Sequence, residues 1–245
     1  MIKSISFKNS AGNTLSAFHH VPPKETRRGI IFCHGMESNK EGIKAKFLSE
    51  QFEKAGFHFL RFDFRYCGKS DGKFENITLS GEVEDLHSAY QYFLRNNISE
   101  ISLIGSSLGG TIAMIFASLN PQIKKLVTLA SPYLFEKLFT QWFPGDMLKR
   151  FKIDGHVILP DKKKLCYTFV EDALSYHFEN ILSAVPCPVL LIHGSQDNVV
   201  AIENTYFADK LIRTQKELVI IEGGDHTLNE RMDDFFPALK KFICE

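Results

Sequence analysis

The sequence is poor in the features that mark several specialised classes of protein. Its 245 residues include only five cysteines and one tryptophan, and 29 basic residues balance 29 acidic ones. This zero net charge argues against a nucleic-acid groove or a polybasic membrane surface. No apolar run approaches the roughly 18 residues of a membrane-spanning helix; the longest, such as Val189-Leu190-Leu191-Ile192, are as short as strands. We expect a soluble globular protein without nucleic-acid partners or a membrane span.

The cysteines also exclude common redox and zinc motifs. They stand at positions 33, 67, 166, 187 and 244, never at C-x-x-C spacing, and free thiols in a reducing compartment are the simplest interpretation. The N-terminal segment Met1–Asn9 mixes polar with apolar residues and lacks the core of a signal peptide. We therefore expect a cytoplasmic protein. No histidine spacing typical of a metal site is present, so we expect no metal and no cofactor.

Strand-like and helix-like segments alternate along most of the chain. Residues 2–7 and 14–20 alternate apolar with polar side chains around an Ala-Gly-Asn turn, which predicts an antiparallel hairpin. The further strands are expected at 29–33, 57–62, 101–104, 125–130, 188–192 and 218–221. The helices are expected at 44–55, 80–95 (with Ser80 as its cap), 108–119, 202–213 and 230–243. Such alternation predicts a mostly parallel sheet with helices on both faces.

This alternation breaks once, between two predicted strands. Residues 131–185 are irregular in pattern and rich in aromatic side chains. The segment is too long for a simple crossover and too apolar for a linker. We interpret it as a cap inserted into a core made of residues 1–130 and 186–245.

The strongest chemical motif is Gly105-Ser106-Ser107-Leu108-Gly109-Gly110, which fits G-x-S-x-G with Ser107 at its centre. Ser106 does not fit, because Ile104 stands two residues before it. A sharp turn from a strand into a helix would expose the Ser107 hydroxyl as a nucleophile, with glycines where the backbone passes closely. The alternative is a glycine-rich turn with a capping serine.

A serine nucleophile needs a base and a group that orients the base. His193-Gly194-Ser195-Gln196-Asp197 follows one predicted strand, and Gly224-Asp225-His226 follows the last one. The order Ser107, Asp197, His226 is that of a nucleophile-elbow hydrolase. The alternatives are a turn-capping Asp197, a surface His226, and Asp225 in place of Asp197 as the orienting acid.

The tetrahedral intermediate also needs two backbone donors. Leu108 N–H follows the nucleophile, and Met36 N–H belongs to the loop His34-Gly35-Met36 after an early strand; the alternative for this loop is a simple strand-ending turn. Gly68-Lys69-Ser70 imitates a phosphate-binding loop, but Asp63 stands where that motif requires glycine. We expect Asp63 to hold its own loop through backbone hydrogen bonds.

These motifs together resemble the α/β-hydrolase superfamily. They are His34-Gly35-Met36, the segment 61–65 with Gly68–Gly72, the turn around Ser107, and the segments 193–197 and 224–226. Within the superfamily the chain is similar to small bacterial carboxylesterases of the cinnamoyl (feruloyl) esterase type and to monoacylglycerol-lipase-like hydrolases. The resemblance implies an α/β fold with a mostly parallel eight-stranded sheet flanked by helices. It also implies a Ser107–Asp197–His226 triad and a cap that shapes the acyl pocket.

The expected function is that of a serine esterase. It would cleave a small-molecule carboxylic ester through an acyl-enzyme, with Met36 and Leu108 as the oxyanion hole. The same triad would serve a thioesterase, an amidase or peptidase, or an acyltransferase. A non-catalytic binding protein of this fold is a further alternative. The sequence leaves the substrate, the acyl chain length and the oligomeric state open.

Overall fold

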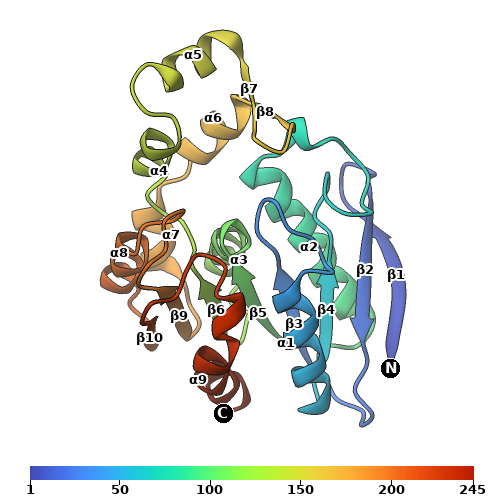
Figure 1. The fold of residues 1–245 in the computed structure, drawn as a ribbon. Coiled ribbons are helices and arrows are strands. Elements are labelled where there is room, and N and C mark those ends of the chain that lie inside the picture. The colour runs from blue at the N-terminus through green and yellow to red at the C-terminus, as the bar shows by residue number, and fades with distance from the viewer.

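A twisted eight-stranded sheet forms the centre of the molecule (Figure 1). The computed structural model describes all residues, Met1–Glu245. The strand order is β1-β2-β4-β3-β5-β6-β9-β10. The strands are β1 (Ile2–Lys8), β2 (Thr14–His20), β3 (Arg28–Cys33), β4 (His58–Phe62), β5 (Glu100–Ser106), β6 (Leu126–Leu129), β9 (Val189–Gly194) and β10 (Lys216–Ile221). Only β2 pairs antiparallel with its neighbours, β1 and β4, so the prediction of a mostly parallel eight-stranded sheet is confirmed.

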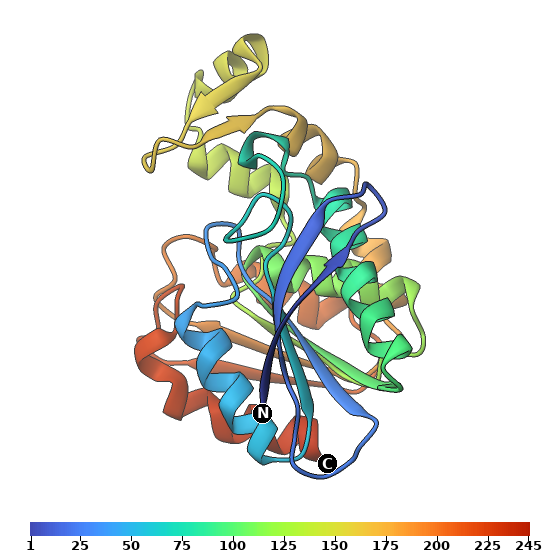
Figure 2. The same ribbon diagram turned by 90° about the vertical axis from the view of Figure 1, so that its right-hand side faces the viewer.

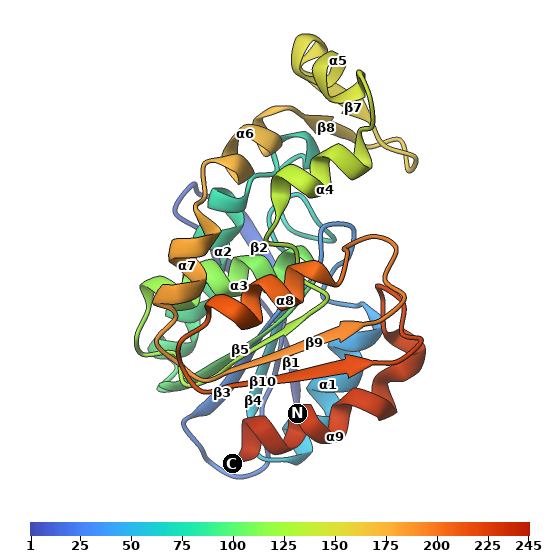
Figure 3. The same ribbon diagram turned by 90° about the vertical axis from the view of Figure 1, so that its left-hand side faces the viewer.

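Helices cover both faces of the sheet (Figures 1 and 3). One face carries α1 (Ile43–Lys54) and α9 (Met232–Cys244), and the other carries α2 (Leu79–Arg95), α3 (Leu108–Leu119), α7 (Phe178–Ala184) and α8 (Glu203–Leu211). Two short 3₁₀ helices, η1 (Phe74–Asn76) and η2 (Asn229–Arg231), lie in loops.

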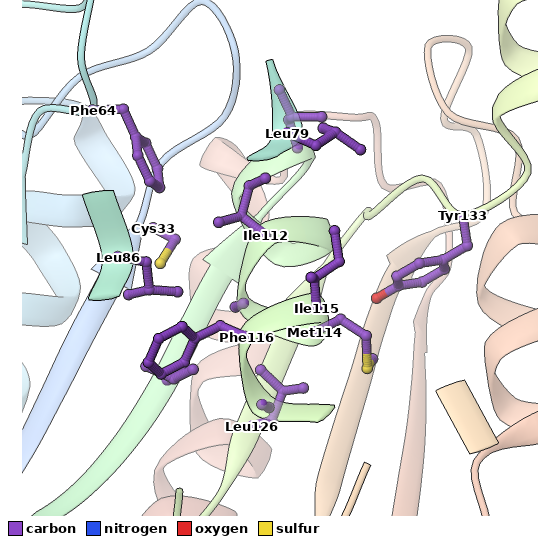
Figure 4. Packing of buried hydrophobic residues seen from close by; sticks show 14 of the residues in the cluster. Cys33, Phe64, Leu79, Leu86, Ile112, Met114, Ile115, Phe116, Leu126 and Tyr133 are labelled. Carbon is purple, nitrogen blue, oxygen red and sulfur yellow. The ribbon is translucent and has the colours of Figure 1, made fainter. Parts of the chain in front are cut away.

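Each helix layer closes its own apolar cluster over the sheet. The larger one surrounds α3, whose largely apolar sequence matches its position between α2 and the strands. Figure 4 shows Ile112 and Phe116 of α3 beside Leu86 of α2 and Cys33 of β3. The smaller cluster packs α1 and α9 against the opposite face. Because helices pack against both faces, the sheet is rigid and holds the loops at its strand ends in fixed positions.

The segment between β6 and β9 is ordered, which corrects the expectation that it is irregular. It forms α4 (Phe135–Trp142), α5 (Met147–Asp154), the antiparallel pair β7 (His156–Ile158) and β8 (Lys164–Cys166), and α6 (Thr168–Leu174) before α7. These elements stand at the end of the molecule opposite both termini (Figures 1 and 2). We propose that residues 131–185 are a cap on the core 1–130 and 186–245, with α7 returning the chain to the helix layer beside α3.

Hydrogen bonds attach this cap segment to the core at its base. The Asn204 side chain on α8 accepts bonds from the Tyr133 and Leu134 amides, both at 2.8 Å. On the other side, the Ser80 hydroxyl donates to Asp172 of α6 at 2.6 Å. Ser80 therefore does not cap α2 as predicted.

The N-cap of α2 is instead Thr78, whose hydroxyl accepts the Gly81 N–H at 3.0 Å. Thr78 and Ser80 are two positions apart, and the apolar spacing of a helix does not locate its N-cap that accurately.

All five cysteines are free; Cys33, Cys67 and Cys187 are buried, and Cys244 is exposed. None of the helices has both the length and the apolar character that crossing a membrane requires.

Candidate active site

Ser107 occupies a strained turn between β5 and α3. Its backbone has φ 54° and ψ −128°, a conformation that side-chain-bearing residues rarely adopt. The neighbouring glycines make the turn possible. A Cβ on Gly105 would lie 2.4 Å from the Gly109 carbonyl oxygen, and one on Gly109 would lie 2.2 Å from the Cys33 carbonyl oxygen. The turn therefore presents the Ser107 hydroxyl beyond the strand end, as the motif predicts.

The structure brings the three predicted triad side chains together. Ser107 Oγ lies 3.0 Å from His226 Nε2, and His226 Nδ1 lies 2.7 Å from Asp197 Oδ2. The three residues follow β5, β9 and β10, whose carboxyl ends meet at one edge of the sheet; we call this the carboxyl edge. The Asp197 side chain is fully buried and that of His226 is 19% exposed. The arrangement gives a hydroxyl, a base and a buried carboxylate in one hydrogen-bonded chain.

Asp197 is held as an ionised carboxylate. Burial by itself would raise its pKa, but hydrogen bonds from His193 and His226 outweigh burial, and the pKa of Asp197 is lowered. The amides of Val199 and Val200 both donate to Oδ1 at 2.8 Å. Oδ2 is therefore left to face His226 in a fixed orientation.

His193 is a site residue that the sequence reasoning missed. Its Nε2 lies 3.1 Å from Asp197 Oδ2 and 2.9 Å from the Val200 carbonyl oxygen. Both atoms are acceptors, so Nε2 carries the proton. Nδ1 lies 2.6 Å from the Thr205 hydroxyl, within hydrogen-bond distance. The buried ring donates to the same oxygen that His226 uses. A histidine ending a buried strand four residues before the acid was the available signal.

Asp225, the alternative acid, faces its own turn. Its Oδ1 accepts the Leu228 N–H at 2.7 Å, and the Thr227 hydroxyl donates to both carboxylate oxygens at 3.0 Å. It makes no hydrogen bond to the His226 ring, which is occupied by Asp197. Between the two aspartates, the structure favours Asp197 as the partner of the base.

The two predicted oxyanion donors belong to two segments that adjoin Ser107. Leu108 is the first residue of α3, and Met36 follows β3 in the loop that passes Ser107. A Cβ on Gly35 would be 3.1 Å from the Ser107 Cβ, which shows how closely this loop approaches. Neither the Met36 nor the Leu108 amide donates to another group of the protein. Both are free to bind a developing oxyanion.

His34 shapes the loop that carries Met36. Its Nε2 accepts the Phe64 N–H at 3.1 Å, so the ring proton is on Nδ1, which donates to the Gly35 carbonyl at 2.8 Å. Burial lowers the pKa of His34, which keeps the ring neutral. The interpretation of His34-Gly35 as a bare strand-ending turn is therefore too simple.

Asp63 holds the adjacent loop, as predicted. Its carboxylate accepts the Lys69 N–H at 2.8 Å and the Lys40 N–H at 2.7 Å. It also pairs with the buried Lys40 ammonium group. These bonds fix two loops beside the site, and Asp63 has no contact with the triad.

A pocket of about 1160 Å³ opens in front of Ser107. Its wall on the cap side is entirely apolar, formed by Trp142, Phe143, Met147, Val157, Ile158, Leu159 and Pro160. Its polar side chains all belong to the core: His34, Glu37, Ser38, Lys44, Ser106, Ser107, His226, Thr227 and Asn229. No three His, Cys, Asp or Glu side chains gather as metal ligands would. The pocket therefore has an apolar wall on the cap side and, on the core side, a wall that carries all of its polar side chains, Ser107 among them; we call the second the polar wall.

Comparison with known proteins agrees with this geometry. The family model described as the alpha/beta hydrolase fold matches residues 30–158, just over half of the chain. Among curated proteins, the mouse (Mus musculus) palmitoyl-protein thioesterase ABHD10, mitochondrial, is 28% identical over 241 residues, which is 94% of this chain and 78% of that one. The solved structure of mouse alpha/beta hydrolase domain-containing protein 10 has 25% identity and a TM-score of 0.75, and covers 97% of this chain and 99% of that one.

A bacterial structure is similar over its whole length. Est1E from Butyrivibrio proteoclasticus with bound ferulic acid is 26% identical with a TM-score of 0.89, and covers 98% of this chain and 97% of that chain.

Proposed function

The chain belongs to the α/β-hydrolase family, and from this premise we propose that it is a serine esterase that uses Ser107, His226 and Asp197. One observation carries the proposal: a continuous chain of hydrogen bonds runs from the Ser107 hydroxyl through both nitrogens of His226 to a buried carboxylate. A serine hydroxyl is a weak nucleophile unless such a base takes its proton. The unused amides of Met36 and Leu108 supply the second requirement, a place for negative charge.

The acylation step follows from these positions. His226 Nε2 takes the Ser107 proton while Oγ forms a bond to the ester carbonyl carbon, and the carbonyl oxygen becomes an oxyanion between the amides of Met36 and Leu108. Asp197 accepts the Nδ1–H of His226 and stabilises the imidazolium that forms. The bond from carbon to the leaving oxygen then breaks, and His226 gives its proton to that oxygen. The alcohol leaves and the acyl group stays on Ser107.

Deacylation repeats the cycle with water. His226 takes a proton from a water molecule, whose oxygen attacks the acyl carbon. The bond to Oγ breaks, the proton passes from His226 to Ser107, and the carboxylic acid leaves. The apolar cap wall suits an acyl group with a hydrocarbon or aromatic body. The ferulic acid bound in Est1E is such a body in a similar protein.

The direct test is hydrolysis of a p-nitrophenyl ester series from acetate to palmitate, with a cinnamoyl ester added. We expect Ser107→Ala to lower kcat/KM by at least about 10⁴-fold and to abolish labelling by a fluorophosphonate probe. The matched control is Ser106→Ala, which removes the neighbouring hydroxyl and is expected to retain labelling. Esterase activity that survives in Ser107→Ala would place the nucleophile elsewhere, and a folded wild type that is never labelled would favour a non-catalytic binding protein.

A thioester substrate is the second candidate, because the mouse relative is named a palmitoyl-protein thioesterase. The same triad serves either bond, since the attacked carbonyl and the oxyanion are alike. Paired oxygen and sulfur esters of one acyl group separate the two: a thioesterase would show the higher kcat/KM on the sulfur ester after correction for uncatalysed hydrolysis. Amide cleavage is measured on the same enzyme with an aminoacyl amide as substrate. Acyl transfer is measured by adding an alcohol that competes with water for the acyl group.

A further inference from the structure

The polar wall of the pocket contains a lysine that the proposed mechanism does not use. Lys44 lies in the first turn of α1, and Gly42, Ile43 and Ala45 beside it also line the pocket. Its ammonium group donates a hydrogen bond to the carbonyl oxygen of Thr227. Because Thr227 follows His226 directly, this places a cation beside the base of the triad.

Lys44 has no carboxylate partner. Two lysines near it in the sequence do have one: Lys40 pairs with Asp63, and Lys46 on the same helix lies 3.9 Å from Glu41. The carboxylates that act on Lys44 from a distance are those of Asp225 and Asp197. Both are already engaged, Asp225 by its own turn and Asp197 by the two histidines.

No ion pair offsets the positive charge of Lys44. Burial lowers the pKa of Lys44 to about 8, the opposite of what an ion pair would do. The N-terminal end of α1 adds partial positive charge of the same sign to the same wall. A negatively charged ligand would offset both the charge of Lys44 and the partial positive charge of the helix end. It could accept hydrogen bonds from the ammonium group and from the first backbone amides of α1.

We propose that Lys44 and the first turn of α1 form a subsite for an anionic group, a carboxylate or a phosphate, on the leaving-group side of the ester. The inference rests on the proposed function. The side is assigned from Thr227: Lys44 is bonded next to His226, the residue that protonates the leaving oxygen. The apolar cap wall is left for the acyl group. The substrate class is an ester whose acyl part is apolar and whose alcohol is negatively charged.

The test compares two esters that differ by one charge. The first is 4-butyryloxybenzoate, whose leaving phenol carries a carboxylate, and the second is its neutral methyl ester; both rates are corrected for alkaline hydrolysis. We expect the wild type to favour the anion by about tenfold in kcat/KM, as one charge-assisted hydrogen bond provides. In Lys44→Met this ratio falls to about one, and in Lys44→Arg it is retained. Lys46→Met, on the same helix but with an exposed side chain, keeps both rates.

Three more substrates define the site. A phosphonate in place of the carboxylate shows which anion is preferred. A p-nitrophenyl hemisuccinate and its methyl ester place the charge on the acyl side instead. We expect the ratio for this second pair not to depend on Lys44. A dependence confined to the acyl-side pair would overturn the assignment to the leaving group.

The pH dependence gives an independent measure. Lys44 is charged below its pKa of about 8 and neutral above it, so the anion preference should decline between pH 7 and pH 9. The ratio of the two esters cancels the titration of the triad, which acts on both. Asp225 and Asp197 are the carboxylates that act on Lys44 from a distance, and Glu37 is the one acidic side chain that lines the pocket. In Lys44→Arg the ratio should stay level over the same interval.

Failure of the subsite and failure of the proposed function look different. Equal ratios in the wild type and Lys44→Met, with both enzymes active, would overturn the anionic subsite and leave the esterase intact. Cleavage of neither ester, together with no fluorophosphonate labelling of Ser107, would overturn the proposed function and the subsite with it.

Discussion

The carboxyl edge of the sheet and the cap face the same pocket with different kinds of residue. At the carboxyl edge, hydrogen bonds fix the side chains of His34, Asp197 and His226. The cap contributes seven lining residues, all apolar. Hydrogen bonds are directional and position atoms to fractions of an ångström, whereas apolar contacts depend on shape and area. From this comparison we propose that the carboxyl edge performs the chemistry and that the cap selects the substrate.

The energetic consequences differ in the same way. Removing a hydrogen-bonding group at the carboxyl edge should lower the rate for every substrate, because the transition state is shared. Removing an apolar group from the cap wall should change rates only for substrates long enough to touch it. Substitutions in the two regions therefore test the comparison directly, and their expected effects span several orders of magnitude.

The largest effect is expected for Asp197→Asn. An asparagine of the same shape can offer its amide to His226, which would place the imidazole proton on the wrong nitrogen and remove the charge that stabilises the imidazolium. We expect kcat/KM to fall by about 10³- to 10⁴-fold. The factor should be the same for acetate and for longer esters. The measurement is the p-nitrophenyl ester series, with circular dichroism as the control for folding. The matched variant Asp225→Asn should lose far less, because that carboxylate holds only its own turn.

A loss in Asp225→Asn equal to that in Asp197→Asn would reverse the assignment of the acid. A factor that varied with acyl length in Asp197→Asn would break the comparison between the carboxyl edge and the cap.

A smaller loss in kcat/KM is expected when His193 is replaced, because we expect this residue to hold Asp197 without touching the substrate. In His193→Phe the Asp197 carboxylate loses one donor to Oδ2, so its orientation is less fixed. One hydrogen bond to a charged group is worth about 1.5–3 kcal/mol, which corresponds to about a ten- to hundredfold loss in kcat/KM. The acid limb of the pH profile should move to higher pH, because a carboxylate with fewer donors holds the proton on His226 more firmly.

The His193 prediction includes its own rescue. His193→Gln keeps an N–H donor near Asp197 and should recover part of the rate and of the pH profile. Thr205→Val, which removes only the bond to Nδ1, should have the mildest effect of the three. A reduced melting temperature with an unchanged pH profile would indicate that His193 is merely part of the core.

His193 and Lys44 show where sequence reasoning stops. The turn around Ser107 was predictable because Gly105 and Gly109 approach each other within one short motif, and α3 begins and ends where its apolar run does. Lys44 is bonded to Thr227, 183 positions later in the chain, and such a long-range pair leaves no spacing pattern. His193 stands four residues before Asp197, but this spacing alone does not show which side chain the ring contacts.

The sheet and the cap also differed in how well the sequence predicted them. Alternation in the first two strands and short apolar runs in the others predicted every strand of the large sheet, with ends that shifted by up to two residues. In the cap, α4 to α7 are seven or eight residues long, which is about two turns. Two turns are too few to show a helical period among many aromatic residues. Their positions come from packing around buried Phe139, Phe151 and Phe169.

The smallest effect is expected for Leu159→Ala, on the cap wall. Its side chain is partly buried and lines the pocket, far along the chain from the triad. Truncation removes apolar contact with a long acyl chain but leaves the carboxyl edge untouched. We expect about a tenfold loss in kcat/KM for the longest esters that the wild type accepts, and less than about a twofold change for acetate. The matched control is Leu174→Ala, a leucine of α6 that is outside the pocket and 41% exposed. Because the loss should appear as a change of slope across the chain-length series, an equal loss at every length would mean that the cap also positions the catalytic groups.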